Sequence, residues 1–313
     1  MSGVAHYGKI LLFGEYSLLY GSDALTIPYR KKKVMLHFPY KNTSEELNQI
    51  AGHSNKQLQL FFQYLNSHKK NTATYLDLAA MQQDLNEGLF LESDIPSGYG
   101  LGSSGALIAA LFNRFGKQPY NRTDDHSAKA LMRLQEIFSF MEGFFHGKSS
   151  GIDPLSSFLN HALLIKSGNK PETTDQIMPI FGDKSGLFLI DTKLSRKTAP
   201  LVQIFKEKSS DKKFIETLQQ KYIPLNNECI DALLNGCRTF QEKFFSLSDL
   251  QLRYFREMIP EHFLQIWTQG LSSGLFSLKL CGAGGGGYLL GYANDLSGID
   301  KKLQYKHIEQ VLF

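Results

Sequence analysis

The chain has 313 residues, a net charge of +4 and 42% hydrophobic residues. This length is sufficient for large hydrophobic cores and for more than one domain. The charge excess is small and the basic run Arg30–Lys33 is short, which argues against a nucleic-acid surface. No apolar stretch approaches the roughly 20 residues of a membrane span. The three cysteines (Cys229, Cys237, Cys281) have neither disulfide nor zinc spacing. We therefore expect a cytoplasmic enzyme that binds neither nucleic acid nor membrane.

The N-terminal segment predicts a buried strand that ends at a glycine turn. Lys9 precedes the apolar run Ile10–Phe13, and Glu15 and Tyr16 follow Gly14. Lys9 and Glu15 are either solvated surface groups or members of a site.

A glycine-rich segment, Ile95–Leu107, runs into the apolar residues Ala106–Phe112 and predicts a loop that enters a helix N-terminus. The first backbone N–H groups of a helix have no partner, and glycines let the main chain approach an anion closely. The segment lacks both the Gly-Lys-Ser/Thr ending of a Walker loop and the GxGxxG pattern. It indicates a phosphate loop of another kind, or else an ordinary serine–glycine helix cap.

Residues 127–145 have apolar residues at helical spacing on nearly every face, which predicts a buried helix ended by Gly143 and Gly147. Glu142 is then a partly buried carboxylate that must pair or bind a metal. The loop after the helix carries Asp153. For His146 we favour a capping or core role over metal binding.

The second half of the chain begins after a predicted linker, residues 166–183. It continues with a strand at 186–192, helices around 199–218, 227–245 and 248–273, and a strand-like end at 305–313. Four consecutive glycines, Gly284–Gly287, lie between apolar residues, which favours a buried loop against a ligand over a flexible linker. The pattern predicts an α+β protein with antiparallel sheets and helices on one face of each.

Four motifs together resemble the GHMP kinases, over nearly the whole chain. In chain order they are Lys9 with Gly14-Glu15, the loop Gly100–Ser104, Glu142 with His146-Gly-x-x-Ser-Gly-Ile-Asp153, and Gly282–Gly287. Within that family the His146–Asp153 string is most similar to the mevalonate kinase branch. The resemblance implies a two-domain fold, with a ribosomal-protein-S5-like N-terminal domain (1–182) that binds ATP and a ferredoxin-like C-terminal domain (183–313).

The resemblance also implies the role of each site residue in ATP- and Mg²⁺-dependent phosphorylation of the primary hydroxyl of mevalonate. Asp153 and Lys9 would be catalytic, and Ser104 and Glu142 would hold Mg²⁺. The ATP phosphates would lie on Gly98, Gly100, Leu101, Gly102, Ser103, Ser104 and Gly105. Mevalonate would contact Glu15, Tyr16, Ser150, Arg196, Thr198, Ala283 and Gly284.

Two positions depart from the pattern of that branch. Tyr16 stands where His is common, and Gly105 stands where Ala is usual. Gly-Glu-Tyr also occurs in phosphomevalonate kinases, so that activity is the first alternative. A non-catalytic ligand sensor is disfavoured because Lys9, Ser104, Glu142 and Asp153 are all present. The sequence leaves open whether Asp153 takes the proton of the hydroxyl or only orients it, and whether the chain forms a homodimer.

Overall fold

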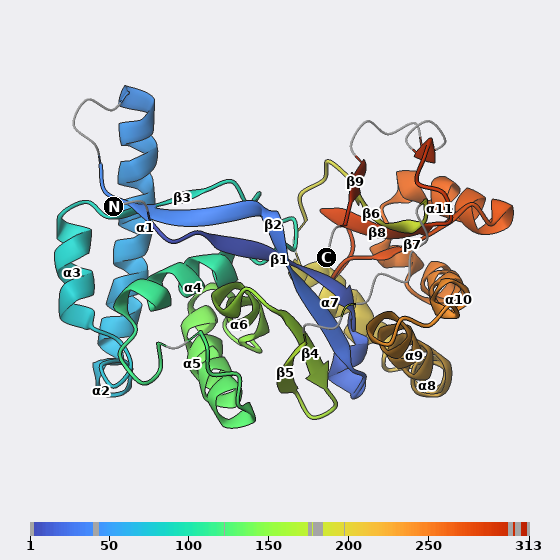
Figure 1. Ribbon diagram of the computed structural model, residues 1–313, viewed down its shortest axis with the longest axis horizontal. Helices are drawn as coiled ribbons and strands as arrows, with labels where there is room; N and C mark the ends of the chain where they lie inside the picture. Colours follow the sequence, from blue (N-terminus) through green and yellow to red (C-terminus); the bar gives the residue numbers. More distant parts are fainter. Residues whose placement is uncertain are drawn as a thin grey trace.

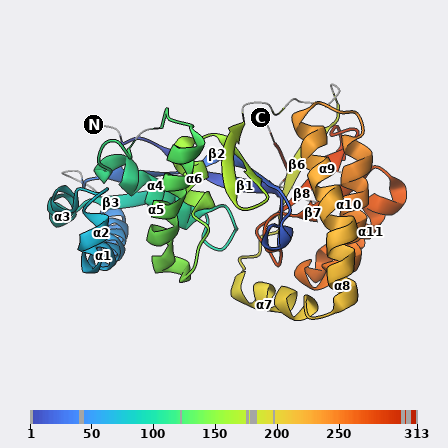
Figure 2. The ribbon, with the colours of Figure 1, turned by 90° about the horizontal axis from the view of Figure 1, so that it is seen from below.

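The computed structural model describes residues 3–39, 44–121, 123–174, 177, 184–196, 198–299, 303 and 308–311. Two antiparallel sheets lie side by side, each with helices packed against it (Figures 1 and 2). The predicted α+β class is confirmed. The strands are β1 (His6–Phe13), β2 (Ala24–His37), β3 (Phe90–Ser93), β4 (Ala162–Lys166), β5 (Lys170–Thr174), β6 (Gly186–Asp191), β7 (Phe276–Leu280), β8 (Tyr288–Ala293) and β9 (Ile308–Gln310).

Helices connect the strands and supply most of the covering layers. The α-helices are α1 (Glu45–Ser67), α2 (Lys69–Thr72), α3 (Leu78–Asn86), α4 (Ser103–Phe115), α5 (Ala128–His146), α6 (Ile152–Leu159), α7 (Thr198–Lys208), α8 (Lys212–Thr217), α9 (Ile223–Leu234), α10 (Phe240–Tyr254) and α11 (Glu261–Ser273). Two 3₁₀ turns, η1 (Ser17–Tyr20) and η3 (Arg256–Met258), and one π-helical turn, η2 (Leu218–Tyr222), complete the described elements.

The first sheet has the order β1-β2-β4-β5, with β3 paired to the far part of β2. Strand β2 is 14 residues long, so it can pair with β1, β3 and β4 along its length. The basic run 30–33 lies in the middle of this strand and is largely exposed. It is therefore a solvated stretch of a long strand.

The second sheet has the order β7-β8-β6-β9, and α7–α11 lie between β6 and β7 in the chain. This order agrees with the ferredoxin-like arrangement expected for the C-terminal half. The division of the chain at 182/183 stays a prediction, because residues 178–183 lie outside the described residues.

Strand β1 has no exposed residue. Ile10 and Leu12 belong to the hydrophobic cluster shared with the C-terminal sheet, whereas Leu11 packs against the cluster under α4–α6. A strand covered on both faces has a continuous apolar sequence in place of an alternating one. This explains why the run Ile10–Phe13 predicted a buried strand correctly.

The predicted linker at 166–183 is wrong in its first part. Residues 170–174 form β5, which pairs with β4. Gly168 and Asn169, both at positive φ, form the turn of this hairpin. Of the residues that suggested a linker, Gly168 is therefore a turn residue and Pro171 lies in β5. Of the rest, residues 175–176 and 178–183 lie outside the described residues, as does most of the predicted strand-like end at 305–313.

All three predicted C-terminal helices have wrong boundaries. The first, predicted around 199–218, is two helices, α7 and α8, separated at residues 209–211. The structure ends α9 at Leu234 and begins α10 at Phe240, with Gly236 at positive φ between them. Helix α10 then continues to Tyr254, and α11 begins after Pro260. The glycine and the proline are the local breaks, and the apolar periodicity on both sides of each concealed them.

Helices α4 and α6 approach closely at Gly105. A Cβ added to Gly105 would lie 2.8 Å from both Asp153 C and Pro154 N. The absence of a side chain at this position therefore sets the distance between the two helices, and with it the place of Asp153.

We expect Gly105→Ala to lower the free energy of unfolding by about 1–3 kcal/mol, because α6 must move away from α4. Gly52→Ala is the matched control, since Gly52 is exposed in α1 and an added Cβ meets no atom within 4 Å. That control should stabilise the protein by up to about 1 kcal/mol. Urea unfolding of both variants checks this, and equal stabilisation by the two substitutions would contradict it.

Candidate active site

The glycine-rich loop enters α4 as the sequence predicted. Gly102 is the N-cap of α4 at φ 71°, and no side chain caps the helix. Ser103, Ser104 and Gly105 form its first turn, so their N–H groups lie at the positive end of the helix dipole. This geometry suits a phosphate, and it places Gly98, Gly100 and Leu101 immediately before the helix.

Lys9 and Asp153 meet beside this loop. Lys9 Nζ lies 3.1 Å from Asp153 Oδ1, and their side chains are 9% and 35% exposed. The backbone N–H of Lys9 donates to Leu101 O at 2.8 Å, which ties β1 to the loop. A Cβ added to Gly102 would lie 3.1 Å from Lys9 Cγ and 3.4 Å from Asp153 Oδ2. Glycine at 102 therefore leaves the room in which the pair forms.

We expected Asp153 to lie in a loop, but the structure places it in a helix. It is the second residue of α6, with Pro154 third, a position where the missing N–H of proline breaks no helical hydrogen bond. The carboxylate is stabilised there by the helix N-terminus as well as by Lys9.

Glu142 lies near the end of α5 and is more deeply buried than the partial burial that the sequence predicted. Ser104 Oγ donates to its Oε1 at 3.2 Å, and Ser149 Oγ donates to its Oε2. Burial, followed by the charge of Asp153, raises the pKa of Glu142 to about 7, while the two serine hydroxyls and Lys9 oppose that rise. Near neutral pH the Glu142 carboxyl group is therefore partly protonated. A bound cation would favour its ionised form.

His146 is exposed at the end of α5, so it is not the core histidine we considered. Its Nε2 lies 3.1 Å from Ser104 Oγ, which places the ring at the same cluster as Glu142. Within the described ranges, no group of three or more His, Cys, Asp or Glu side chains could hold a metal ion. Ser104 and Glu142 are the oxygen donors that fit a hard cation such as Mg²⁺ at this point.

Arg196 joins the two glycine-rich segments. Its Nη1 donates to Cys281 O at 3.2 Å and Gly284 O at 2.8 Å. Its guanidinium lies between Gly100 and Gly282, where an added Cβ would meet Nη2. The buried Nε has no hydrogen-bond partner, and no carboxylate of the described part of the chain pairs with this side chain. A partly buried cation whose hydrogen bonds go to carbonyl oxygens favours an anionic ligand.

The Gly284–Gly287 run is a loop between β7 and β8, and it is largely buried, as predicted. The groups that approach its backbone come from the protein itself. Gly285 N donates to Met258 O at 2.6 Å and Gly287 N donates to Leu194 O at 2.7 Å.

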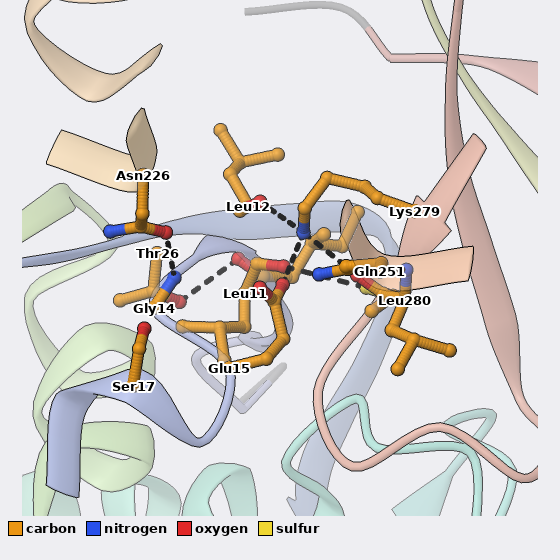
Figure 3. A network of polar contacts seen from close by, with 12 residues as sticks. Leu11, Leu12, Gly14, Glu15, Ser17, Thr26, Asn226, Gln251, Lys279 and Leu280 are labelled. Atoms are coloured by element: carbon orange, nitrogen blue, oxygen red, sulfur yellow. Dashed lines mark hydrogen bonds and ion pairs between the residues drawn. The ribbon is translucent and has the colours of Figure 1, made fainter. Parts of the chain in front are cut away.

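Glu15 and Tyr16 lie at the turn after β1, facing this loop. The Glu15 carboxylate is wholly buried and pairs with Lys279 of β7 (Figure 3). Tyr16 stacks on Phe205, with ring centroids 4.5 Å apart, and its hydroxyl donates to Ala283 O at 2.7 Å. Burial raises the pKa of Tyr16, so its hydroxyl remains protonated and able to donate.

Two predicted site residues lie farther out. Ser150 is exposed, and its Oγ accepts from Ile152 N at 3.4 Å at the start of α6. Thr198 is exposed as the first residue of α7. The structure thus brings Lys9, Asp153, Ser104 and Glu142 together, and it leaves Ser150 and Thr198 at the surface. Their contact with a substrate stays a prediction.

The sequence analysis missed Ser149 and Lys279. The signal for Lys279 was present, because a lone lysine within an otherwise apolar strand must find a buried partner. Nothing in the sequence distinguished Ser149 from Ser150.

Comparisons with known proteins agree with the geometry. Residues 68–160 match the family model of the GHMP kinases N-terminal domain. The chain is 24% identical to the mevalonate kinase of Archaeoglobus fulgidus over 289 residues, which cover 91% of this chain and 89% of that protein. The resemblance that the four motifs indicated is therefore confirmed.

Solved structures share the fold. The mevalonate kinase of L. major in complex with R-mevalonate has a TM-score of 0.60 at 18% identity, covering 99% of this chain and 94% of that one. A Streptococcus pneumoniae phosphomevalonate kinase in complex with phosphomevalonate and AMPPNP has a TM-score of 0.59 at 16% identity, covering 99% and 100%. Among the described residues, no helix is both long and apolar enough to span a bilayer.

Glu142 should make stability fall as the pH rises. The pKa of Glu142 is raised from 4.5 to about 7 on folding, so the folded state retains a proton that the unfolded state releases in this interval. The stabilising contribution is complete below pH 4.5 and is lost by about pH 7, a loss of about 3 kcal/mol relative to a glutamine at this position.

Urea unfolding without divalent cations between pH 4.5 and 8 measures this slope. Glu142→Gln should lose it, whereas Glu136→Gln, at an exposed position of the same helix, should behave like the wild type. Identical slopes in wild type and Glu142→Gln would show that Glu142 does not titrate in this range.

Proposed function

We propose that the chain is a GHMP kinase and that it transfers the γ-phosphoryl group of ATP to the primary hydroxyl of mevalonate. The observation that most supports this is the Lys9–Asp153 pair, 3.1 Å apart, at the N-terminus of α4. Phosphoryl transfer requires mainly that the protein align donor and acceptor and neutralise developing charge. An ammonium and a carboxylate beside a phosphate-binding helix terminus meet both requirements.

In this proposal residues 1–182 form the nucleotide-binding domain. The backbone of Gly98–Gly102 and the first turn of α4 hold the ATP phosphates. Ser104 and Glu142 hold Mg²⁺, which when bound neutralises phosphate charge and orients the transferred group. The buried position of Glu142 strengthens this interaction, because a carboxylate screened from water attracts a cation more strongly.

Asp153 orients the acceptor hydroxyl and is the base nearest to its proton. The new bond forms between the hydroxyl oxygen and the γ-phosphorus, and the bond from that phosphorus to the β,γ-bridging oxygen breaks to release ADP. Lys9 holds the Asp153 carboxylate in an ion pair and would stabilise the transferring group.

Arg196 is the anchor for the acceptor carboxylate. Among the described residues of the site, this partly buried cation forms no ion pair with a carboxylate, whereas Lys9 and Lys279 are paired. A single unpaired guanidinium fits one carboxylate. An acceptor that also carries a phosphate calls for further cations, which favours mevalonate over phosphomevalonate.

We expect ADP release with mevalonate in the presence of Mg²⁺, and little with 5-phosphomevalonate, galactose or homoserine. A coupled ADP assay over this panel tests the acceptor directly. Turnover of 5-phosphomevalonate without turnover of mevalonate would assign the alternative activity that Tyr16 suggests. Absence of turnover with the whole panel would favour a ligand sensor.

Asp153→Asn should lower kcat by about 10² or more while ATP binding survives, the effect typical of losing a positioned base. Lys9→Met should also lower kcat, and the double variant should lose far less than the product of the two effects, because both groups act on one transition state. Asp249→Asn, which removes a partly exposed partner of Arg253 in α10, is the control. Fully multiplicative effects would contradict a shared role.

A further inference from the structure

Lys279 is a wholly buried lysine in the middle of the second sheet. Every residue of β7 is buried, and the exposed fraction of Lys279 is 0%. Its Nζ donates to Leu12 O and Leu280 O, each at 2.7 Å, and to the Glu15 carboxylate (Figure 3). All three N–H donors of the ammonium are therefore used.

Stability alone does not explain this pair. Two charges removed from water pay a large desolvation cost, and a well-packed hydrophobic pair of the same volume is often equally or more stable. Glu15 retains one buried oxygen without a partner, which adds to that cost. The position of the Lys279–Glu15 pair indicates a second role, which is to fix the segments that carry the two residues.

The pair connects two segments that both reach the acceptor side of the site. Glu15 directly precedes Tyr16, and Lys279 lies three residues before Gly282, where the glycine loop Gly282–Gly287 begins. The hydroxyl of Tyr16 in turn donates to Ala283 O at 2.7 Å. The turn after β1 and the loop after β7 are thus joined twice, once by Lys279 with Glu15 and once by Tyr16 with Ala283.

Neighbouring side chains hold the same two segments from the helical layer. Asn226 Oδ1 accepts from Gly14 N at 3.0 Å, and Gln251 Oε1 accepts from Leu280 N at 2.7 Å (Figure 3). The loop also carries the carbonyls of Cys281 and Gly284 that hold Arg196. A shift of the loop would therefore move the guanidinium.

We propose that Lys279 is a positioning residue for the acceptor site: with Glu15 it sets the glycine loop against Tyr16 and so places Arg196. Glu15 then acts through Lys279, in place of the direct substrate contact that the resemblance implied. The identity of the acceptor in this inference rests on the proposed function. The link between the Lys279–Glu15 pair and the position of the glycine loop rests on the contacts alone.

Kinetics of Lys279→Met tests the role at the acceptor, at a temperature where the variant is folded. The acceptor KM should rise about tenfold or more while the KM for ATP stays within about twofold, because only the acceptor side is displaced. Thr72→Ala is the control for lost stability. It removes a buried hydroxyl of α2 that donates to Leu65 O of α1, and it should leave both KM values unchanged.

Hydrogen exchange tests the coupling without any substrate. Amides of residues 282–287, including Gly285 and Gly287, should exchange faster in Lys279→Met, while those of α4 should not change. A wild type without mevalonate turnover would overturn the proposed function but leave this measurement intact. Wild-type exchange and wild-type acceptor KM in folded Lys279→Met would overturn the inference.

The double variant Lys279→Met/Glu15→Met covers the case in which the single variant does not fold, because it leaves no unpaired buried charge. We expect it to regain stability but to keep the raised acceptor KM and the faster loop exchange. Recovery of stability, KM and exchange together would show that the pair is purely structural, and would overturn the proposal.

Discussion

Burial of β1 on both faces is the constraint on which the rest of the structure depends. The strand supplies apolar side chains to the clusters on either side of it, so it cannot shift without exposing one of them. Lys9 near its start and the Glu15 turn after its end are therefore fixed in space. The loop that precedes α4 is fixed to the same strand by the hydrogen bond from Lys9 N to Leu101 O.

Among the described residues of the site, the cations Lys9, Lys279 and Arg196 differ in their partners. Lys9 and Lys279 each have a carboxylate, and both pairs cross between segments far apart in the chain. Arg196 has only carbonyl oxygens among the described residues. Because a partly buried charge without an ion-pair partner is unfavourable, a bound anion would stabilise Arg196. The low dielectric around Arg196 also strengthens its attraction for an anionic ligand.

The elements that the sequence predicted well are those in which a local pattern is unambiguous. Helix α5 lies within one residue of the predicted start and end, because its apolar spacing is continuous and Ser127 and Gly147 cap it. The linker at 166–183 failed because turn residues of a hairpin and of a linker have the same composition. Asp153 was placed in a loop because Pro154 suggests a break, whereas proline also fits the first turn of a helix.

By itself the sequence determined the continuous burial of β1, the loop that enters α4, the buried carboxylate of α5 and the family to which these motifs point. The first three follow from spacing or turn chemistry within about 20 residues, and the family follows from the resemblance of four motifs spread over nearly the whole chain. Only the tertiary structure decided that Lys279 meets Glu15, 264 positions away, and that Arg196 meets Gly284, 88 positions away. Local patterns specify which residues must be buried, but the partner of a buried charge is chosen by how the two sheets pack together.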